Sequence, residues 1–262
     1  LKMKLSRKDV QLVRELQSGG SGIVFFGQMT STRNPVAVKI IPLQSIAITK
    51  IFLLECKICE TFAKQPNMIS TLGWFIDGKN GFIVMELMSG DLMDTIGQPR
   101  SENEQKKLLL QICRAINILH SNKIAHMDIK PENILLDRDG NIKLADFGSC
   151  AHFDDVISES ALSTILYSAP ESRKYVSFDK AAADIWSLGV VFYVLLTGAY
   201  PFVGETESQI ATSLAKQQLD FEELESGKFS LQLKSLIKQM LQFDPAMRPS
   251  ICQVLYHLSL SQ

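Results

Sequence analysis

The sequence lacks an excess of charge of either sign. Its 262 residues include 27 Lys and Arg against 28 Asp and Glu, so the formal net charge at pH 7 is −1. A chain that binds nucleic acid or an anionic membrane through its overall charge is usually strongly basic. We therefore expect no direct nucleic-acid partner and no membrane partner.

Cysteines are few and scattered, and their number is odd: Cys56, Cys59, Cys113, Cys150 and Cys252. This usage is typical of a reduced, intracellular protein and not of a disulfide scaffold. The CxxC formed by the first two would need a second pair of ligands to make a metal site, and none is visible. We interpret that pair as ordinary helix cysteines.

Long apolar runs are also missing. The longest, "IWSLGVVFYVLL" at residues 185 to 196, has about 12 residues, whereas a membrane-spanning helix needs about 20. We interpret it as a buried core helix. The first ten residues, "LKMKLSRKDV", are polar and no apolar stretch follows them, so no signal peptide is indicated.

The sequence does contain enough apolar residues, 46%, for a sizeable core in one large domain or two lobes. The first third is rich in short strand-like runs: "VQLVREL", "GIVFFGQM", "PVAVKIIP", "MISTLGWFID" and "GFIVMEL". The last two, joined at Gly78, predict a hairpin. One helix is predicted between the third and fourth runs, at about residues 45 to 63.

After Gly90 the pattern becomes helical. Ser101 and Glu104 form a capping-box signature before a helix with one apolar stripe. Gly198 is placed to end the helix at 185 to 196. The sequence thus predicts a strand-rich lobe of about 88 residues, then a helix-rich lobe, with a cleft between them near "MELMSGD".

Two features of the strand-rich lobe could carry chemistry. In "LQSGGSGIVFFG", Gly19, Gly20 and Gly22 lie between two strands, where glycine lets the backbone approach phosphates, although a plain hairpin turn is an alternative. In "VAVKI", Lys39 lies inside an apolar strand. A buried lysine needs an anionic partner, for which Glu55 is the candidate; a surface-facing lysine is the alternative.

Two further segments concentrate polar side chains. "IAHMDIKPENILL", at residues 124 to 136, places Asp128 five residues before Asn133. One can accept a proton while the other binds a metal ion. In "LADFGS", Asp146 follows a strand and precedes a flexible glycine, which suits a magnesium ligand and equally an Asx turn.

In this order and spacing, the motifs resemble those of the eukaryotic protein kinase family, serine/threonine branch. They are Gly19-x-x-Gly22, Lys39, Glu55, "HMDIKPEN", "DFG" (146 to 148), "APE" (169 to 171), "DIWSLG" (184 to 189) and Arg248. The resemblance extends from about residue 9 to 255. It implies an α+β, bilobal protein-kinase fold with an ATP cleft between the lobes. Residues 1–88 would form a small β-rich N-lobe with one key helix, and residues 89–262 a larger helical C-lobe.

The resemblance also implies roles for the polar residues. Gly19 and Gly22 would cover the ATP phosphates. Lys39, paired with Glu55, would hold the α and β phosphates.

The same resemblance implies the chemistry of the second lobe. Asp128 would accept the proton of the substrate hydroxyl, and Lys130 would steady the transferred phosphoryl group. Asn133 and Asp146 would bind Mg²⁺, for which Mn²⁺ can substitute.

The remaining implied positions concern the adenine pocket and the framework. The adenine would lie between apolar side chains, which also suit ordinary core packing: Leu16, Val24, Ala37, Leu135 and Ala145. Backbone groups of Glu86 and Met88 would contact the adenine edge, and Met85 would guard the back pocket. Asp184 would brace the catalytic loop, and Glu171 would form a buried structural ion pair with Arg248.

Four residues bear on the protein substrate. Lys130, and Thr164 in "STILYSAPE", resemble the serine/threonine branch. Asp91 and Glu132 match positions that read arginines in basophilic relatives. We therefore predict a preference for basic protein substrates; the alternative is that both carboxylates are solvated or contact ribose.

The sequence departs from the family pattern at two positions. Gln17 replaces the first loop glycine, which should stiffen the loop. Met127 replaces the arginine that normally grips a phosphate on the activation segment. Activity is therefore predicted not to require phosphorylation of that segment, including its serines at 158, 160 and 163.

Two other classes remain open: a pseudokinase acting as an ATP-binding scaffold, and a small-molecule kinase of related fold. The compact length suits an excised domain or a minimal enzyme, such as a viral kinase. We expect an intracellular location, in the cytoplasm, the nucleus or both. The substrate, the source and the oligomeric state are not predicted.

Overall fold

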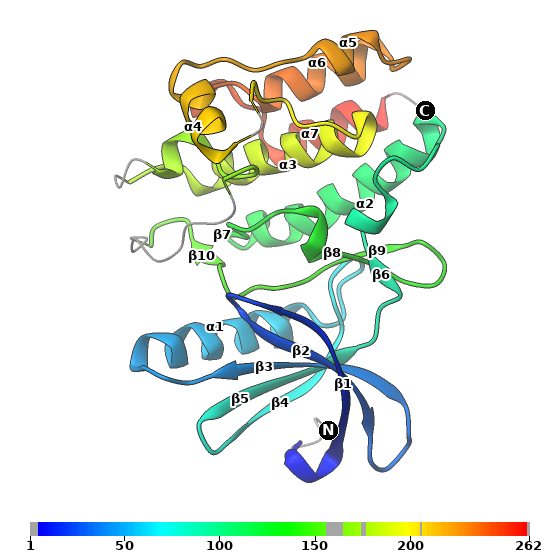
Figure 1. Cartoon of the computed structure of the whole chain (residues 1–262), viewed down its shortest axis with the longest axis vertical. Helices are drawn as coiled ribbons and strands as arrows, with labels where there is room; N and C mark the ends of the chain where they lie inside the picture. Colours follow the sequence, from blue (N-terminus) through cyan, green and yellow to red (C-terminus); the bar gives the residue numbers. More distant parts are fainter. Residues whose placement is uncertain (1–4, 156–164, 174–176, 205, 261–262) are drawn as a thin grey trace. The chain divides into compact units, whose positions relative to one another are not determined.

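The computed structural model describes residues 5–155, 165–173, 177–204 and 206–260 (Figure 1). The chain divides into two compact units, as expected for a bilobal fold. The first comprises Leu1–Gly90 and Leu136–Gly148, and the second Asp91–Leu135 and Ser149–Gln262. Whereas the sequence predicted a single boundary after residue 88, residues 136–148 cluster with the first unit. Backbone hydrogen bonds explain this, because Ile69 N donates to Leu144 O (3.0 Å) and Leu144 N donates to Asn67 O (2.8 Å).

The first unit is built on an antiparallel five-stranded sheet with the order β1-β2-β3-β5-β4. Its strands are β1 (Val10–Gly19), β2 (Gly22–Met29), β3 (Pro35–Pro42), β4 (Thr71–Asp77) and β5 (Asn80–Glu86), and η1 (Arg7–Asp9) precedes them. In the central strand β3, Lys39 pairs with Val24 on one side and Ile83 on the other. The hairpin predicted on either side of Gly78 is present as β4 and β5.

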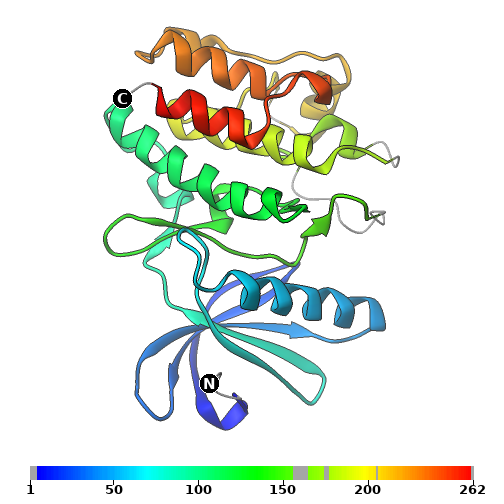
Figure 2. The same cartoon turned by 180° about the vertical axis from the view of Figure 1, so that it is seen from behind.

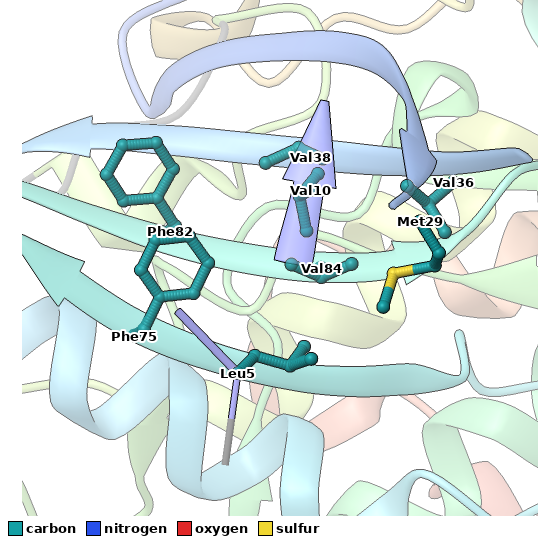
Figure 3. Packing of buried hydrophobic residues seen from close by; sticks show 8 residues of the cluster. All are labelled: Leu5, Val10, Met29, Val36, Val38, Phe75, Phe82 and Val84. Carbon is teal, nitrogen blue, oxygen red and sulfur yellow. The ribbon is translucent and has the colours of Figure 1, made fainter. Parts of the chain in front are cut away.

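One face of this sheet carries a hydrophobic cluster, drawn in Figure 3: Leu5, Val10, Met29, Val36, Val38, Phe75, Phe82 and Val84. Phe75 and Phe82 stack with ring centroids 4.6 Å apart and an interplanar angle of 8°. Successive side chains in a strand point to opposite faces. The alternate residues of the same strands, including Lys39 on β3 and Gly81 on β5, therefore face the other way.

The helix α1 (Ile46–Phe62) is the single long helix of the first unit's described residues. It begins after Ser45, whose Oγ accepts a hydrogen bond from Ile48 N at 3.2 Å, an N-cap that satisfies one free amide. The buried residues share one side of the helix: Phe52, Glu55, Cys56, Ile58, Cys59 and Phe62. A charged residue, Glu55, is thus carried into the interior by an otherwise apolar surface.

The second unit is mainly helical (Figure 2). Its helices are α2 (Glu102–Ser121), α3 (Lys180–Thr197), α4 (Glu207–Ala215), α5 (Glu222–Ser226), α6 (Leu231–Met240) and α7 (Ile251–Ser259). α2 packs against α7, and α3 packs against α6. The predicted capping box is present, since Glu104 N donates to Ser101 Oγ (3.3 Å) and Ser101 N donates to Glu104 Oε2 (2.8 Å).

The helix α3 is the core of this unit. By length and composition alone it could cross a membrane, but 83% of its 18 residues are buried inside the protein. It ends at Gly198, whose φ of 76° is the left-handed conformation that favours glycine. The core-helix interpretation of residues 185 to 196 agrees with this burial.

Short elements connect the larger ones. They are β6 (Gly90–Asp91), η2 (Met93–Thr95), β7 (Ile124–Ala125), η3 (Pro131–Asn133), β8 (Ile134–Leu136), β9 (Ile142–Leu144), β10 (Ala151–His152), η5 (Pro170–Arg173) and η6 (Pro245–Met247). β7 and β10 pair antiparallel within the second unit, with Ala125 opposite Ala151. The polar segment at residues 124 to 136 therefore begins at a strand and ends in one.

Candidate functional site

Lys39 of the first unit is buried between two carboxylates. Its Nζ lies 2.7 Å from Glu55 Oε1 and 2.9 Å from Asp146 Oδ1. β3 supplies the lysine, α1 supplies the glutamate, and the segment after β9 supplies the aspartate. The expected pairing with Glu55 is present, and the lysine side chain does not face the surface. We call Lys39, Glu55 and Asp146 the ion cluster.

The ion cluster shifts the pKa of each member. Burial alone would lower the pKa of Lys39, but the charges of Glu55 and Asp146 outweigh it and hold that pKa above its ordinary value. Burial raises the pKa of Glu55, which the charge of Lys39 offsets only in part. Burial would also raise the pKa of Asp146, but Lys39 and hydrogen bonds hold it well below its ordinary value. Asp146 is therefore the firmly ionised carboxylate.

The glycine-rich loop joins β1 to β2 and reaches the ion cluster. Ser21 Oγ donates a hydrogen bond to Asp146 Oδ2 at 2.8 Å, and Gly148 N donates to Asp146 Oδ1 at 3.3 Å. Ser21 was not predicted from the sequence, because nothing local marks a partner 125 residues away.

The loop glycines differ in what they allow. Gly22 has a φ of +129°, and a Cβ there would lie 2.5 Å from Ile40 O, so the backbone requires glycine. At Gly19 and Gly20 an added Cβ would meet no atom of the described residues within 4 Å. These two glycines therefore leave open space beside the loop.

The predicted adenine-pocket residues of the first unit differ in strand position and in exposure. The strand register places Val24 opposite Lys39, and Ala37 opposite Met85, so all four share one face of the sheet. Leu16 is exposed and Ala145 is buried.

The predicted adenine-edge residues lie at the end of β5 and beyond it. Glu86 Oε1 accepts a hydrogen bond from Ser70 N and pairs with Lys143 Nζ, each at 2.7 Å. Its side chain is therefore committed to the protein, and its backbone N donates a hydrogen bond to Ser70 O at 3.0 Å. Met88 and Leu135 are half-buried, and Leu135 belongs to the second unit.

In the second unit, three polar side chains of the segment at residues 124 to 136 converge. Lys130 Nζ lies 2.7 Å from Asp128 Oδ2. Asn133 Nδ2 donates to the backbone O of Asp128 at 2.8 Å and to its Oδ2 at 3.0 Å. Asp128 is thus fixed by a cation and an amide, while its Oδ1 takes part in neither contact. We call Asp128, Lys130 and Asn133 the loop cluster.

Asp184 on α3 fixes the backbone just before the loop cluster. Its Oδ2 accepts from His126 N at 2.8 Å, and its Oδ1 accepts from Met127 N at 2.9 Å. His120 Nε2 lies 2.8 Å from the same Oδ2. His120 was not predicted from the sequence, and its place six residues before His126 gave no signal of a shared partner.

Met127 and Asp146 have left-handed backbones, with φ of 66° and 60°. Non-glycine residues adopt this conformation at a cost of about 1–3 kcal/mol and concentrate at functional sites. The hydrogen bond from Met127 N to Asp184 holds one of these turns. Both residues belong to the segments that the sequence analysis singled out.

The expected ion pair between Glu171 and Arg248 is present. Arg248 Nη1 and Nη2 donate to Glu171 Oε1 at 2.6 Å and Oε2 at 2.8 Å, a bidentate arrangement. Arg248 also donates to Ala182 O at 2.8 Å, and its Cζ lies 5.0 Å from the centre of the Trp186 ring. This pair joins the segment before α3 to the segment before α7, which is a structural role.

The predicted substrate-reading residues have different surroundings. Glu132 Oε2 is buried and finds no hydrogen-bond partner among the described residues. Asp91 Oδ1 accepts from Met93 N at 2.9 Å, so that carboxylate helps to form a turn. Thr164 and the three serines at 158, 160 and 163 lie outside the described residues.

The donor chemistry suits magnesium. No group of three or more His, Cys, Asp or Glu side chains that could hold a metal ion occurs in the part of the chain that the structure describes. Magnesium is usually bound by one or two carboxylates together with substrate phosphates. An ionised Asp146 in the first unit and the amide oxygen of Asn133 in the second unit are each hard donors of that kind, so each residue taken by itself fits the ion.

Comparison with known proteins identifies the family. A family model described as "Protein kinase domain" matches residues 10–259. CBL-interacting serine/threonine-protein kinase 16 of Arabidopsis thaliana is 31% identical over 259 residues, covering 92% of this chain and 54% of its own. CBL-interacting protein kinase 31 of Oryza sativa subsp. japonica is 32% identical over 255 residues, covering 94% and 56%.

A third relative, the CDPK-related protein kinase of Daucus carota, is 35% identical over 239 residues, covering 85% of this chain and 38% of the relative. The chain thus spans about half the length, or less, of these curated relatives. With the ion cluster, the loop cluster and the match of nearly the whole chain in agreement, the chain belongs to the eukaryotic-type protein kinase family.

Proposed function

We propose that this chain is the catalytic domain of an active serine/threonine protein kinase. It transfers the γ-phosphoryl group of ATP to serine or threonine hydroxyls of protein substrates. The observation that carries the proposal is the 2.7 Å ion pair between Lys39 and Glu55. A buried lysine paired in this way is oriented to bind phosphates, because positioning and electrostatics dominate phosphoryl transfer.

Each residue has a task that suits its surroundings. Asp128 accepts the proton of the attacking hydroxyl, and Lys130, 2.7 Å away, stabilises negative charge on the transferred group. Asn133 holds Asp128 in place and offers its amide oxygen to the metal. Mg²⁺, when bound, neutralises phosphate charge. Lys39 and the backbone of the glycine-rich loop orient the phosphates.

We also propose that the kinase does not require phosphorylation of its activation segment. Met127 carries no charge, so it cannot form the ion pair with a phosphate through which such segments are usually ordered. Its backbone is already held by Asp184, and Lys39 is already paired with Glu55.

A preference for basic substrates is a finer proposal. Its support is Glu132, whose Oε2 is buried without a hydrogen-bond partner among the described residues. Such a carboxylate gains from a guanidinium or ammonium group. Asp91 supports the idea less, because its Oδ1 caps a turn. A peptide array should show Arg or Lys enrichment N-terminal to the acceptor, which Glu132→Gln reduces more than Asp91→Asn does. An array without such enrichment would remove this proposal.

The central test measures phosphate transfer from ATP and Mg²⁺ to a basic protein such as protamine. We expect the phosphatase-treated wild type to phosphorylate serine or threonine and Asp128→Asn to lose on the order of a thousand-fold in rate. Replacing the three serines at 158, 160 and 163 by alanine should leave most of the activity. A large loss in that triple variant would overturn independence from phosphorylation.

A pseudokinase scaffold is the alternative, and the same experiment separates the two. A scaffold would bind ATP in a fluorescence titration but transfer no phosphate from the wild type. For the location of the protein we propose the interior of the cell, in the cytoplasm, the nucleus or both. All five cysteines are free thiols, which suits a reducing compartment.

A further inference from the structure

The contact between α1 and β5 has an unusual shape. The aromatic ring of Phe52 on α1 lies where the side chain of residue 81 on β5 would begin. A Cβ added to Gly81 would lie 2.5 Å from Phe52 Cε2, 2.7 Å from Cζ and 2.8 Å from Cδ2. Carbon atoms in ordinary contact are about 3.5–4.0 Å apart. Only glycine at position 81 lets the ring approach the sheet this closely.

A second aromatic residue completes this contact. Trp74 on β4 meets the Phe52 ring edge-on, with centroids 5.8 Å apart and an interplanar angle of 86°. Trp74 Nε1 donates a hydrogen bond to Glu60 Oε1 at 3.2 Å. α1 is therefore attached to the sheet at two points eight residues apart in its sequence. We call Gly81, Phe52 and Trp74 the Phe52 seat.

The Phe52 seat lies next to Glu55, the residue that pairs with Lys39 in the ion cluster. Phe52 and Glu55 are three residues apart, so they project from the same side of α1. Phe52 is fully buried, and the side chain of Glu55 is only 3% exposed. Because a helix moves as a stiff body, a displacement at Phe52 is passed to Glu55 almost undiminished.

We propose that the Phe52 seat is a positioning device for Glu55. Because Gly81 has no side chain, the Phe52 ring packs directly on the backbone of β5, and this contact sets the distance between α1 and the sheet. That distance places the Glu55 carboxylate 2.7 Å from Lys39 Nζ without help from a partner protein. The inference rests on the proposed kinase activity, and it names the packing that keeps the ion cluster assembled.

The size of the clash predicts the size of the effect. With alanine at position 81, the ring has to retreat by about 1 Å to reach ordinary contact. A comparable shift at Glu55 breaks the short contact with Lys39. A misplacement of about 1 Å at an active site can reduce the rate on the order of a hundred-fold. We therefore expect Gly81→Ala to lower kcat/KM for ATP by roughly that factor.

A double variant that exchanges side-chain size between positions 81 and 52 distinguishes a role in positioning Glu55 from a simple loss of stability. In Gly81→Ala/Phe52→Leu the smaller side chain makes room for the added methyl group, so most of kcat/KM should return. The matched control is Phe82→Leu, on the same strand but on the opposite face, where it stacks on Phe75. This control should lower Tm while leaving kcat/KM within about two-fold, since Phe82 packs in the hydrophobic cluster on the face of the sheet that points away from Lys39 and Gly81.

Thiol accessibility gives a readout that does not depend on activity. Cys56 and Cys59 lie on the buried side of α1. Displacement of α1 in Gly81→Ala should make at least one of them react with a thiol reagent such as DTNB, whereas in wild type and Phe82→Leu they stay protected. If Gly81→Ala does not fold, Phe52→Leu alone loosens the seat and should raise KM for ATP several-fold.

The outcomes are distinct. If the double variant stays folded and is no more active than Gly81→Ala, the seat does not position Glu55. The same conclusion follows if Phe82→Leu has the same Tm as Gly81→Ala and loses as much kcat/KM as that variant does. Unchanged kinetics and protected thiols in Gly81→Ala would overturn the proposal as well. A wild type without phosphotransfer would contradict the proposed function instead, and the thiol readout would still decide whether the seat fixes α1.

Discussion

The two units hold their charged residues in different ways. In the first, the ion cluster joins three side chains from distant segments, and the side chains of Lys39 and Glu55 are 5% and 3% exposed. In the second, the loop cluster lies within six consecutive residues, and the side chains of Lys130 and Asp128 are 22% and 14% exposed. The first arrangement depends on how a helix packs on a sheet, whereas the second depends on local backbone geometry.

This difference predicts two kinds of sensitivity. Packing changes in the first unit should separate the ion cluster, because nothing but tertiary contact brings its members together. The loop cluster should respond mainly to changes in Asp184, which holds the backbone before it. Four substitutions test this contrast, in order of decreasing effect.

The largest effect is expected from Lys39→Met. It leaves the buried Glu55 and the partly buried Asp146 without their cation, and breaking a buried ion pair on one side costs about 3–5 kcal/mol. The free energy of unfolding, measured by urea denaturation, should fall by that amount at pH 7. Lys39→Met/Glu55→Leu should recover part of the loss, because it removes one of the unpaired charges. A double variant less stable than Lys39→Met would contradict this account of the cluster.

The same variant should show a characteristic pH dependence. Without Lys39 the folded-state pKa values of both carboxylates rise. A carboxyl whose folded pKa is raised destabilises the fold when ionised, and this penalty is relieved as pH falls towards that pKa. The stability deficit of Lys39→Met against wild type should therefore shrink between pH 7 and pH 5. A deficit that stays constant would mean that the carboxylates remain ionised.

Asp184→Asn should have the next largest effect, and it addresses the second unit. The new amide NH₂ must face at least one of the backbone N–H groups from which the carboxylate now accepts a hydrogen bond, those of His126 and Met127. An unsatisfied buried donor costs about 1–3 kcal/mol. We expect phosphotransfer to fall on the order of a hundred-fold because the loop before Asp128 moves. Asp179→Asn is the matched control. Asp179 Oδ1 caps α3 through Ala182 N, and Asn caps as well as Asp, so activity should be unchanged.

Ser21→Ala should have a smaller effect, of opposite sign. The hydrogen bond from Ser21 to Asp146 occupies a carboxylate oxygen that a metal ion would need. Removing a bond of about 1 kcal/mol should strengthen binding of ATP with Mg²⁺ by about five-fold. Binding of ATP in EDTA should change little, which makes it the control. Weaker binding in Ser21→Ala would show that the serine serves the bound state instead.

The smallest effect concerns the native thiols. Four of the five cysteines are buried and Cys252 is exposed. Burial raises the pKa of Cys59 to about 12, and a protonated thiol is a poor nucleophile. One thiol per chain should thus react with DTNB at pH 8, and five should react in guanidinium. Cys252→Ser should abolish the native reaction; persistent labelling would mean that at least one of the four buried thiols becomes accessible on the timescale of the assay.

Local signals allowed part of this architecture to be predicted. The caps at Ser101 and Gly198, the hairpin at Gly78 and the helix that carries Glu55 follow from turn chemistry and periodicity. The pairing of Lys39 with Glu55 was expected because a lysine in a central strand requires an anion. Motif spacing then identified the family.

Other features could not be predicted, because they depend on distances between remote segments. Residues 136–148 cluster with the first unit through hydrogen bonds to residues near 68. Ser21 meets Asp146 across 125 positions, and the ring of Phe52 lies over Gly81. None of these leaves a periodic or compositional trace, since a serine in a loop and a glycine in a strand suit many environments.

The position of the two tryptophans has a practical consequence for optical spectroscopy. The chain has only two: Trp74 belongs to the first unit, in contact with Phe52, and Trp186 to the second, beside Arg248. Each unit thus carries its own intrinsic fluorophore. With Trp186→Phe or Trp74→Phe, emission would report the melting of one unit at a time, so the cooperativity between the two could be measured without an attached label.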